Sequence, residues 1–181
     1  MIQISTSGVE AAVLRFATEA LPGSYENLVD ALARLLETTD AEVVVIDRAG
    51  EIDGRQVLQP VAQVWRTYRE EMEMAWPVFY LDEAPLQAAT LASGQPWLVI
   101  DSRLVEGTYG ETYRTLNPPI VAEACFPIGG EGGLLGMVSF VVCEDAKSWS
   151  EAELTALGTV AEVVGILWAR TALEERLSAQ V

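Results

Sequence analysis

The sequence predicts an α/β fold of the α+β type, in which about six strands form a central antiparallel sheet and helices lie at both ends of the chain. Three observations lead to this prediction: two strand-like runs flank a glycine-rich turn, a long apolar-periodic helix follows them, and two amphipathic helices precede the first strand-like run. A chain of 181 residues, half of them apolar, is long enough to bury a full core as one domain.

Two helices are expected at the start of the chain. The first spans residues 8–21 and stops at the Pro22-Gly23 pair, which is a strong turn signal. The second spans residues 25–39, with Ser24 as its N-cap and with leucines that follow a period of 3.6 residues.

Four strand-like runs are expected in the middle of the chain: residues 41–47, 56–65, 77–81 and 97–100. Pro60 moves the second run towards a sheet edge or a break, because proline cannot donate a hydrogen bond to a neighbouring strand. The charged segment 68–74 is ambiguous between helix and loop. A short helix beginning at Asp82 or Glu83 is expected to end near Ala92, followed by Gly94 as its C′ glycine.

The clearest pattern lies within residues 120–168. A strand-like run from Val121 to Ile128 leads into the glycine-rich turn Gly129–Gly133, and a second run continues from Leu134 to Cys143. Glycine adopts positive φ without a Cβ clash, so two antiparallel strands can reverse direction there. Ser150 and Glu153 then form a candidate capping box for the final helix.

The composition excludes several classes of function. The net charge is −16 and the pI is near 4.2, which disfavours nucleic acid and anionic membrane surfaces as partners. The absence of histidine removes histidine-dependent triads, histidine-ligated haem and most zinc sites. No apolar run reaches the ~20 residues of a membrane span, no signal peptide is expected, and we expect a cytoplasmic protein.

Two stretches carry a resemblance to a known family. The residues CFPI, the glycine-rich turn, LLGMVSF and WSEAELTAL resemble the C-terminal half of a GAF domain, and LASGQPWLVID is similar to its middle, where a strand terminates in an aspartate. The resemblance implies a single GAF-like domain over residues 1–181, with residues 1–23 as a helical extension and 169–181 as a possible linker. It also implies that the terminal helices pack on one face of the sheet.

In GAF domains the region equivalent to residues 102–119 is the wall or lid of a ligand pocket, so the resemblance implies a pocket here. This connection is the longest irregular one expected in the chain. Aromatic residues cluster in the middle third, and an inward-facing arginine would suit an anionic ligand. Alternatively, the arginines face solvent or pair with nearby glutamates. The predicted ligand-binding residues are Trp65, Tyr80, Asp101, Arg103, Tyr109, Tyr113 and Arg114.

The final helix, residues 151–178, is apolar on more than one side and so has more to bury than one sheet face covers. One interpretation is a core helix with a solvated end. The other is a helix whose second half pairs with a second copy, giving a homodimer through the terminal helices. The predicted interface residues are Leu157, Ala161, Val164 and Trp168.

We expect no catalytic residue, no metal and no named cofactor, because no motif places a nucleophile, an acid–base pair or metal ligands together. Haem, bilin and cyclic nucleotide are not first choices, since the residues that GAF domains use for the last two are missing. The expected function is non-enzymatic sensing of an unidentified small molecule, coupled to a dimer interface. The first alternative is a ligand-free interaction module. The second is a methionine sulfoxide reductase-like enzyme using Cys125 and Cys143, which we interpret instead as buried thiols.

Overall fold

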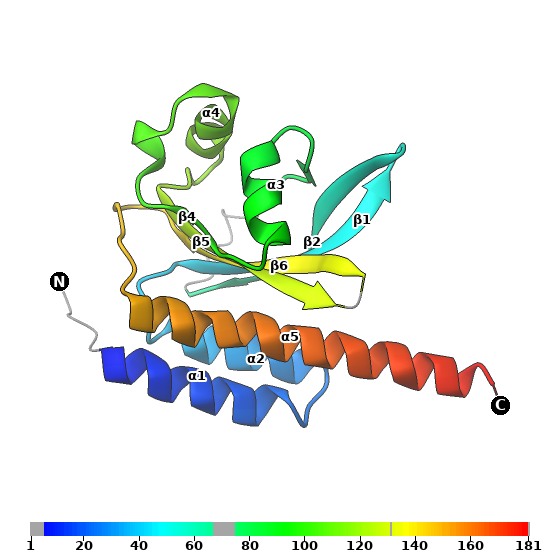
Figure 1. The fold of residues 1–181 in the computed structure, drawn as a ribbon. Helices are drawn as coiled ribbons and strands as arrows, with labels where there is room; N and C mark the ends of the chain where they lie inside the picture. The colour runs from blue at the N-terminus through cyan, green and yellow to red at the C-terminus, as the bar shows by residue number, and fades with distance from the viewer. Residues whose placement is uncertain (1–5, 67–74, 131, 181) are drawn as a thin grey trace.

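The computed structural model describes residues 6–66, 75–130 and 132–180, and the ambiguous segment 68–74 lies outside them. Three layers are visible in Figure 1: a central curled sheet, three long helices below it and shorter helices above it. The lower layer consists of α1 (Thr6–Ala20), α2 (Tyr25–Leu36) and α5 (Glu151–Ser178). The predicted α+β class, with the terminal helices on one face, is confirmed.

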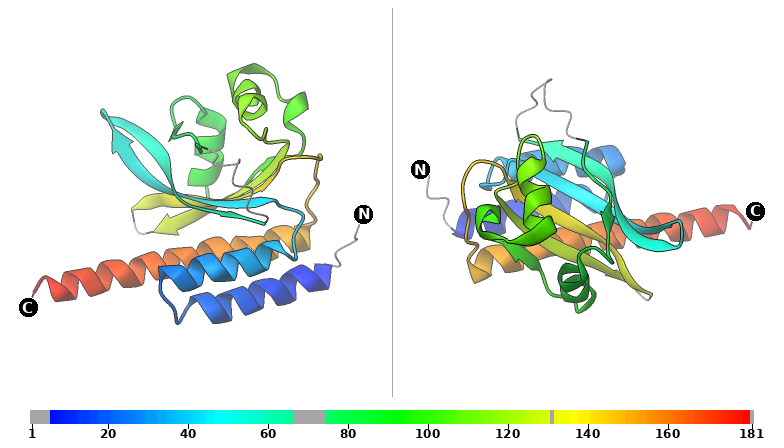
Figure 2. Two further views of the ribbon diagram at one scale, coloured as in Figure 1. Left: turned by 180° about the vertical axis from the view of Figure 1, so that it is seen from behind. Right: turned by 90° about the horizontal axis from the view of Figure 1, so that it is seen from above.

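Within the described residues, six strands form one sheet in the order β3-β2-β1-β6-β5-β4, and every neighbouring pair is antiparallel. The strands are β1 (Val43–Ile52), β2 (Arg55–Trp65), β3 (Phe79–Tyr80), β4 (Trp97–Val99), β5 (Ala122–Gly130) and β6 (Gly133–Val142). The view from above in Figure 2 shows α5 running beneath the sheet and extending beyond it towards the C-terminus.

The predicted hairpin is β5–β6, in which Gly130 pairs with Gly133, and Gly133 has a φ of 110° that favours glycine. Pro60 was expected at a sheet edge or a break, and the strand pairing shows it beside an irregularity. The register between β1 and β2 shifts between Ile46 and Asp47, so that Asp47 faces Pro60. The short β3 pairs only with Val57 and Leu58, which leaves Pro60 on the part of β2 that β3 does not reach.

The two faces of the sheet carry different cores, because successive side chains of a strand point to opposite sides. Ile46, Phe126 and Phe140 belong to the larger core, which packs on α1, α2 and α5. Val45 and Cys125 belong to two smaller cores on the opposite face. That face is covered by α3 (Pro85–Ala92), the 3₁₀ helix η1 (Ser102–Leu104) and α4 (Gly107–Thr115).

The final helix has the predicted bounds, and its N-terminus is a complete capping box: the Ser150 hydroxyl accepts from the Glu153 N–H at 3.1 Å, and the Glu153 carboxylate accepts from the Ser150 N–H at 2.8 Å. Of the helices in the described residues, α5 alone has the length and composition to cross a membrane. This is weak evidence, because the core helix of a folded domain passes the same test.

The region 102–119 differs from the prediction of an irregular connection, since η1 and α4 occupy most of it. The sequence GTYGETYRT has two glycines and three threonines, which are weak helix formers, so its helical pattern is faint. Packing on the sheet therefore stabilises α4, and the buried anchor is Tyr113.

Candidate functional site

Polar side chains gather on the sheet face beneath α3 and α4, where the surrounding residues are apolar. They come from β1, β5, β6, α3 and α4, and six of them are buried: Asp47, Gln87, Tyr113, Glu123, Cys125 and Ser139. We call these six residues the polar cluster. Buried polar groups are normally paired, so a cluster of this kind calls for an account of each polar atom.

One chain of hydrogen bonds joins α4 above the cluster to the strands of the sheet below it. The indole Nε1–H of Trp97 donates to the Tyr109 hydroxyl at 3.0 Å. The Tyr109 hydroxyl is hydrogen-bonded to the Tyr113 hydroxyl, and the Tyr113 hydroxyl donates to the Glu123 carboxylate. The Trp97 and Tyr109 rings meet edge to face, with 5.9 Å between their centroids. This chain attaches α4 to β4 and β5.

A second set of contacts surrounds the thiol of Cys125. The Ser139 hydroxyl on β6 donates to its sulfur at 3.4 Å, and the Gln87 amide on α3 does so at 3.9 Å. Ser139 and Cys125 are direct partners in the β5–β6 ladder. Burial and the nearby Glu123 charge raise the pKa of the Cys125 thiol well above its ordinary value, so this thiol stays protonated and weakly nucleophilic.

Four buried polar atoms have no hydrogen-bond partner in the described part of the chain: both carboxylate oxygens of Asp47, Oε1 of Glu123 and Nε1 of Trp76. Leaving such a group unpaired costs about 1–3 kcal/mol, and more when it is charged. Burial, and to a lesser extent the charge of Glu123, raises the pKa of Asp47 to about 8. Burial also raises the pKa of Glu123, against the opposing effect of the hydrogen bond from Tyr113. Asp47 is therefore mostly protonated at neutral pH.

A pocket of about 80 Å³ opens between the β3–α3 segment and α4, and none of the six residues of the polar cluster lines it. Phe79 and Tyr109 are among its lining residues, together with Tyr80 and Thr112. Since Tyr109 also belongs to the hydrogen-bond chain, the pocket reaches the outer end of the path that leads to Glu123.

The family model described as GAF domain matches residues 25–168. The chain belongs to the GAF family. No curated protein matches the chain. Among solved structures, the phycoerythrobilin-bound GAF domain from a cyanobacterial phytochrome is similar, with a TM-score of 0.71 and 16% identity over 94% of this chain and 100% of that chain.

Two further structures are similar to this GAF domain. The phycocyanobilin-bound GAF domain from a cyanobacterial phytochrome has a TM-score of 0.67 and 18% identity, covering 96% of this chain and 98% of that one. The blue-light absorbing form of the Thermosynechococcus elongatus PixJ GAF-domain has a TM-score of 0.60 and 17% identity, covering 97% and 95%. At these identities the likeness establishes the fold alone.

The seven predicted ligand-binding residues fall into two groups in this GAF domain. Tyr109 and Tyr113 point into the layer between α4 and the sheet, and Tyr109 lines the pocket. Tyr80 also lines the pocket but lies under the Arg55 guanidinium, 4.0 Å from its ring centroid, and half-buried Trp65 packs against the same core as Tyr113. Their role in ligand binding stays a prediction.

The charged members of that set have partners of their own. Arg103 forms an ion pair with Asp101 at 2.7 Å, where Asp101 caps η1, and the hydrogen bonds from Arg103 lower the pKa of this carboxyl. Arg114 donates from Nη1 to the carbonyl oxygens of Ser102 at 2.8 Å and Val105 at 2.9 Å. These contacts brace the turn between η1 and α4, and neither arginine contacts the polar cluster.

Sequence reasoning missed Asp47 and Glu123 as site residues. Each is a carboxyl group in a strand-like run, and Glu123 precedes Cys125 by two positions, which places both on one face of β5. A charged residue inside an otherwise apolar run is the signal that could have identified them.

The two cysteines do not form a redox pair. In the β5–β6 ladder Cys125 is opposite Ser139, whereas Cys143 follows the last paired residue, Val142, which is opposite Ala122. Burial and the charge of Glu42 raise the pKa of the half-buried Cys143 thiol to about 12. The prediction of buried thiols holds for Cys125, whereas Cys143 is only half-buried.

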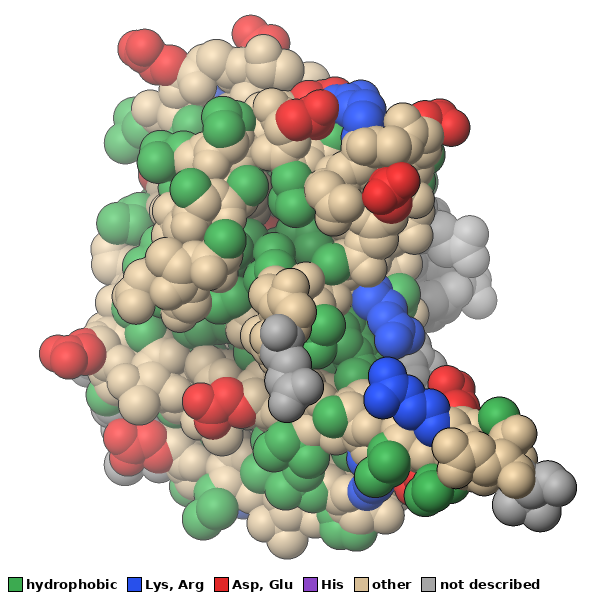
Figure 3. All heavy atoms as spheres, turned by 45° about the vertical axis from the view of Figure 1, so that its right-hand side comes forward, with side chains coloured by type: hydrophobic (Ala, Val, Ile, Leu, Met, Phe, Trp, Pro, Cys, Tyr) green, Lys and Arg blue, Asp and Glu red, His purple; other side chains and the backbone are tan. Residues whose placement is uncertain are grey.

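The residues of α5 that were predicted to form a dimer interface do not lie on the surface of the protomer. Leu157, Ala161 and Val164 are buried in the protomer's own core, and Trp168 packs partly against it, under the Arg48 guanidinium at 5.1 Å from the ring centroid. A second copy could reach other α5 side chains instead. Exposed apolar residues there are Ile166, Leu173 and Leu177. Figure 3 shows apolar side chains gathered along the helical base of the molecule.

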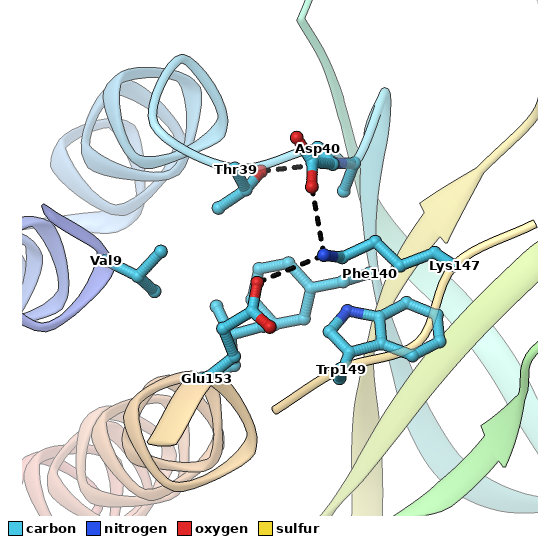
Figure 4. Close-up of a pocket in the computed structure, with 9 residues that line it drawn as sticks. Val9, Thr39, Asp40, Phe140, Lys147, Trp149 and Glu153 are labelled. Carbon is cyan, nitrogen blue, oxygen red and sulfur yellow. Dashed lines mark hydrogen bonds and ion pairs between the residues drawn. The ribbon is translucent and has the colours of Figure 1, made fainter. Parts of the chain in front are cut away.

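Another hollow lies at the start of α5 and is filled by ion pairs. Figure 4 shows Lys147 beside Trp149, with its ammonium group directed at Asp40 and Glu153. The distances are 2.9 Å and 3.0 Å, and the remaining volume is only about 10 Å³. This feature joins the α2–β1 turn to α5 and is a structural contact. Among the described residues, no three histidine, cysteine or acidic side chains are placed to hold a metal ion.

Proposed function

We propose that this GAF domain is a sensory regulatory domain that binds a small molecule, without catalysis, between α4 and the sheet. The observation that carries the proposal is the polar cluster with its unpartnered carboxyl oxygens, which lies under a helix attached by side-chain hydrogen bonds. Buried polar atoms without partners in a folded protein are candidates for ligand contacts. The similar GAF domains bind bilins, and in them the ligand is a small organic molecule.

The coupling route in this proposal is the sheet itself. Glu123 and Cys125 face the ligand side of β5, while Ala124 and Phe126 of the same strand face α5 and α1. A ligand that favours one position of α4 would shift the population of sheet and helix arrangements by its difference in affinity for them.

The output end of the proposal is a homodimer formed through the terminal helices in a cytoplasmic signalling protein. A groove of about 450 Å³ runs along the outer side of α5, with Gly165 and Ile166 in its wall and Pro127 and Gly129 of β5 opposite. A second copy packed here would lie on the reverse side of the strand that carries Glu123.

Native mass spectrometry of the purified protein tests this proposal. We expect a dimer, with an additional mass when the natural ligand copurifies, and hydrogen exchange of α4 that slows in the ligand-bound form. If the protein is monomeric at high concentration, the proposed dimerisation is wrong. Failure of every compound in a broad metabolite screen to slow exchange of α4 would remove the ligand part.

A second candidate function is an interaction module whose pocket is filled by its own side chains. The small volume of the pocket, about 80 Å³, favours it, since pockets for drug-sized ligands span roughly 300–1,000 Å³. The unpartnered oxygens of Asp47 and Glu123 argue against it, because a module that binds nothing there would gain stability by losing them. The metabolite screen decides between the two.

A further inference from the structure

We infer that the α5 helices of two copies pack antiparallel, so that the end of each helix, residues 169–178, lies in the groove along the other. This inference rests on the homodimer of the proposed function and adds the direction and the register in which the two copies meet. It follows from the position of the groove, the exposed end of α5, the spacing of residues along the helix and their charges.

The groove along α5 lies at an edge of the sheet, because the outermost strand is short. β4 pairs with β5 only at residues 123–125, so the part of β5 that includes Pro127 and Gly129 is an edge, and these two residues form one wall of the groove. The other wall consists of Ala161, Glu162, Gly165, Ile166 and Ala169 of α5. Gly165 lies so close to β5 that a Cβ there would be 3.2 Å from the side chain of Ile128. The result is a hollow of about 450 Å³ rather than a flat surface.

The end of α5 projects away from the core of its own protomer. The helix extends beyond the sheet, as Figures 1 and 2 show, and Leu173 and Leu177 on this part are each 57% exposed. Exposed apolar side chains that gather on one element mark a surface for a partner. The groove of a second copy is a hollow that such side chains can enter.

The groove and the exposed end share one side of α5. Positions on this side are separated by alternating steps of four and three, the spacing of residues that face a partner in a pair of helices. They are Glu162, Ile166, Ala169, Leu173 and Arg176. In an antiparallel pair with its two-fold axis at Ala169, Leu173 of each copy lies opposite Gly165 of the other, because both are four positions from the axis. Leu173 then fills the hollow, whereas a parallel pair would place groove against groove and leave both hollows empty.

The charges on this side of α5 also favour the antiparallel arrangement. Glu162 and Arg176 are each seven positions from Ala169, so they meet twice across the two-fold axis as pairs of opposite charge. Neither forms an ion pair within the described residues. A parallel pair would bring Glu162 to Glu162 and Arg176 to Arg176, and like charges that meet across an interface weaken it.

The other charged residues near the end of α5 do not oppose this contact. Arg170 donates to two carbonyl oxygens of the α1–α2 turn, at 2.6 Å and 2.8 Å, which holds it on its own protomer. Glu174 and Glu175 fall outside the spacing of four and three and lie on other sides of the helix. Arg176 is therefore the basic residue of α5 that can meet a second copy.

Antiparallel packing gives the candidate site a direct route to the other copy. The end of each helix lies against Pro127 and Gly129 of the other copy, on the strand that also carries Glu123. A movement of β5 in one copy therefore acts on the helix of the other. The two chains end on opposite sides of the dimer, since the helices run in opposite directions.

A distance measurement by pulsed electron paramagnetic resonance on the full chain tests the direction. A spin label is attached to Thr155→Cys, an exposed position, in a Cys143→Ser background in which the buried Cys125 is unreactive. Residue 155 is 14 positions from Ala169, so we expect the two labels about 40 Å apart, at ~1.5 Å per residue. In a parallel dimer they would be roughly 10–20 Å apart, because packed helices lie about 8–10 Å apart. The short distance would overturn the inference and leave the proposed homodimer in place.

Exchange of the charged pair tests the register. We expect Glu162→Arg and Arg176→Glu each to weaken the dimer about tenfold in sedimentation equilibrium, because each creates two contacts between like charges. The double variant restores both pairs in exchanged form and should return to within about threefold of wild type. Glu175→Arg makes the same change of charge away from the contact and should stay within about twofold. A double variant that dissociates as much as the two single changes combined would overturn the inference. A wild type that is monomeric at high concentration would overturn both the inference and the proposed homodimer.

Discussion

Asp47 is a buried residue whose surroundings do not stabilise its polar group. It lies on a central strand, is fully buried, and has no partner for either oxygen within the described residues. Its pKa of about 8 lowers the free-energy cost of burying this group, because the neutral acid is easier to bury than the carboxylate. Both of its oxygen atoms nevertheless remain unpaired. Proteins retain such groups at sites where they bind or react.

The raised pKa predicts a specific dependence of stability on pH. In the unfolded chain Asp47 titrates near 3.8, and in the folded protein near 8, so the folded state binds more protons between these values. The contribution of Asp47 to the free energy of unfolding is therefore greatest below about pH 4 and falls as the pH rises to 8, by about 5 kcal/mol at most.

Asp47→Asn removes this titration. We expect its free energy of unfolding, measured by urea denaturation from pH 4 to 8, to decline less with pH than that of the wild type. Glu42, whose pKa burial also raises, is present in both proteins and cancels from the difference, whereas Glu123 is coupled to Asp47 and contributes to it. Parallel curves for the two proteins would show that Asp47 is not buried as the structure describes.

At this scale the sequence could suggest which residues carry polar groups but not how they meet. The prediction that Tyr109 and Tyr113 face inward rested on family resemblance and on the amphipathic nature of tyrosine. Asp47 and Glu123 escaped notice because they lie in strands that do not pair directly: β6 separates them. Their position on the same face of the sheet depends on register, which local sequence does not specify.

At the scale of single elements, α4 depends on close contact with the turn before it. Gly110 is buried, and a Cβ at this position would lie 2.1 Å from the carbonyl oxygen of Val105. That atom belongs to the backbone and has little freedom to move. The small residue therefore allows α4 to approach the η1 turn closely enough for Tyr113 to reach Glu123.

We predict that Gly110→Ala loosens α4, with a loss of about 1–3 kcal/mol in the free energy of unfolding, since an inserted methyl group in a packed site forces a shift. Hydrogen exchange of residues 107–115 should accelerate more than that of the sheet. Gly129→Ala is the matched control, because a Cβ there meets nothing within 4 Å. Equal exchange in both variants would contradict the role of this contact.

The start of α5 depends on the chain's single lysine, Lys147, which is held between Asp40 and Glu153. Burial alone would raise the pKa of Glu153, but the hydrogen bond from Ser150 and the charge of Lys147 keep it below its ordinary value. Lys147→Met should reduce the free energy of unfolding at pH 7 by about 1 kcal/mol. Lys147→Arg is the control that retains the charge.

The sign of the pH effect follows from the lowered pKa of Glu153. Glu153 contributes to the free energy of unfolding above the pKa that it has in the unfolded chain, near 4.5. This contribution is lost as the pH falls. The difference between wild type and Lys147→Met, measured by urea denaturation, should therefore shrink below about pH 4. A constant difference down to pH 3 would indicate that the ammonium group acts through packing on Trp149 instead.

At the scale of the whole molecule, one sheet separates the candidate site from the terminal helices. The polar cluster lies on one face, and the larger apolar core, which includes the buried side of α5, lies on the other. The helix continues beyond the sheet, as the side views in Figures 1 and 2 show, with Leu173 and Leu177 exposed on this extension. A partner that covers this part of α5 would be another copy in our proposal.

We predict that Ile166→Glu weakens the proposed homodimer by about tenfold or more, because in that proposal a charge would be buried in the groove along α5. Ile166 is 55% exposed in the protomer, so the fold should be unaffected. Leu104→Glu, at 81% exposure on η1 across the sheet, is the control. Sedimentation equilibrium checks this, and an unchanged dissociation constant for Ile166→Glu would place the interface elsewhere.

Local sequence patterns were enough to predict the fold class, the order of the elements and the ends of the best-formed ones. The hairpin at Gly129–Gly133, the capping box of Ser150 and Glu153, and the bounds of α5 follow from turn chemistry and helical periodicity, which act over a few residues. Family resemblance added that the terminal helices share one face of the sheet.

The residues of the candidate site and the exposed side of α5 could be assigned only from tertiary contacts. α4 is a helix because Tyr113 packs on the sheet, although its own residues favour helix weakly. Leu157, Ala161 and Val164 turned out to be core residues because α1 and the sheet cover that side of α5. The pairing of β1, β6 and β5 places Asp47 and Glu123 on the same face of the sheet, since the arrangement of distant segments depends on register and packing rather than on local pattern.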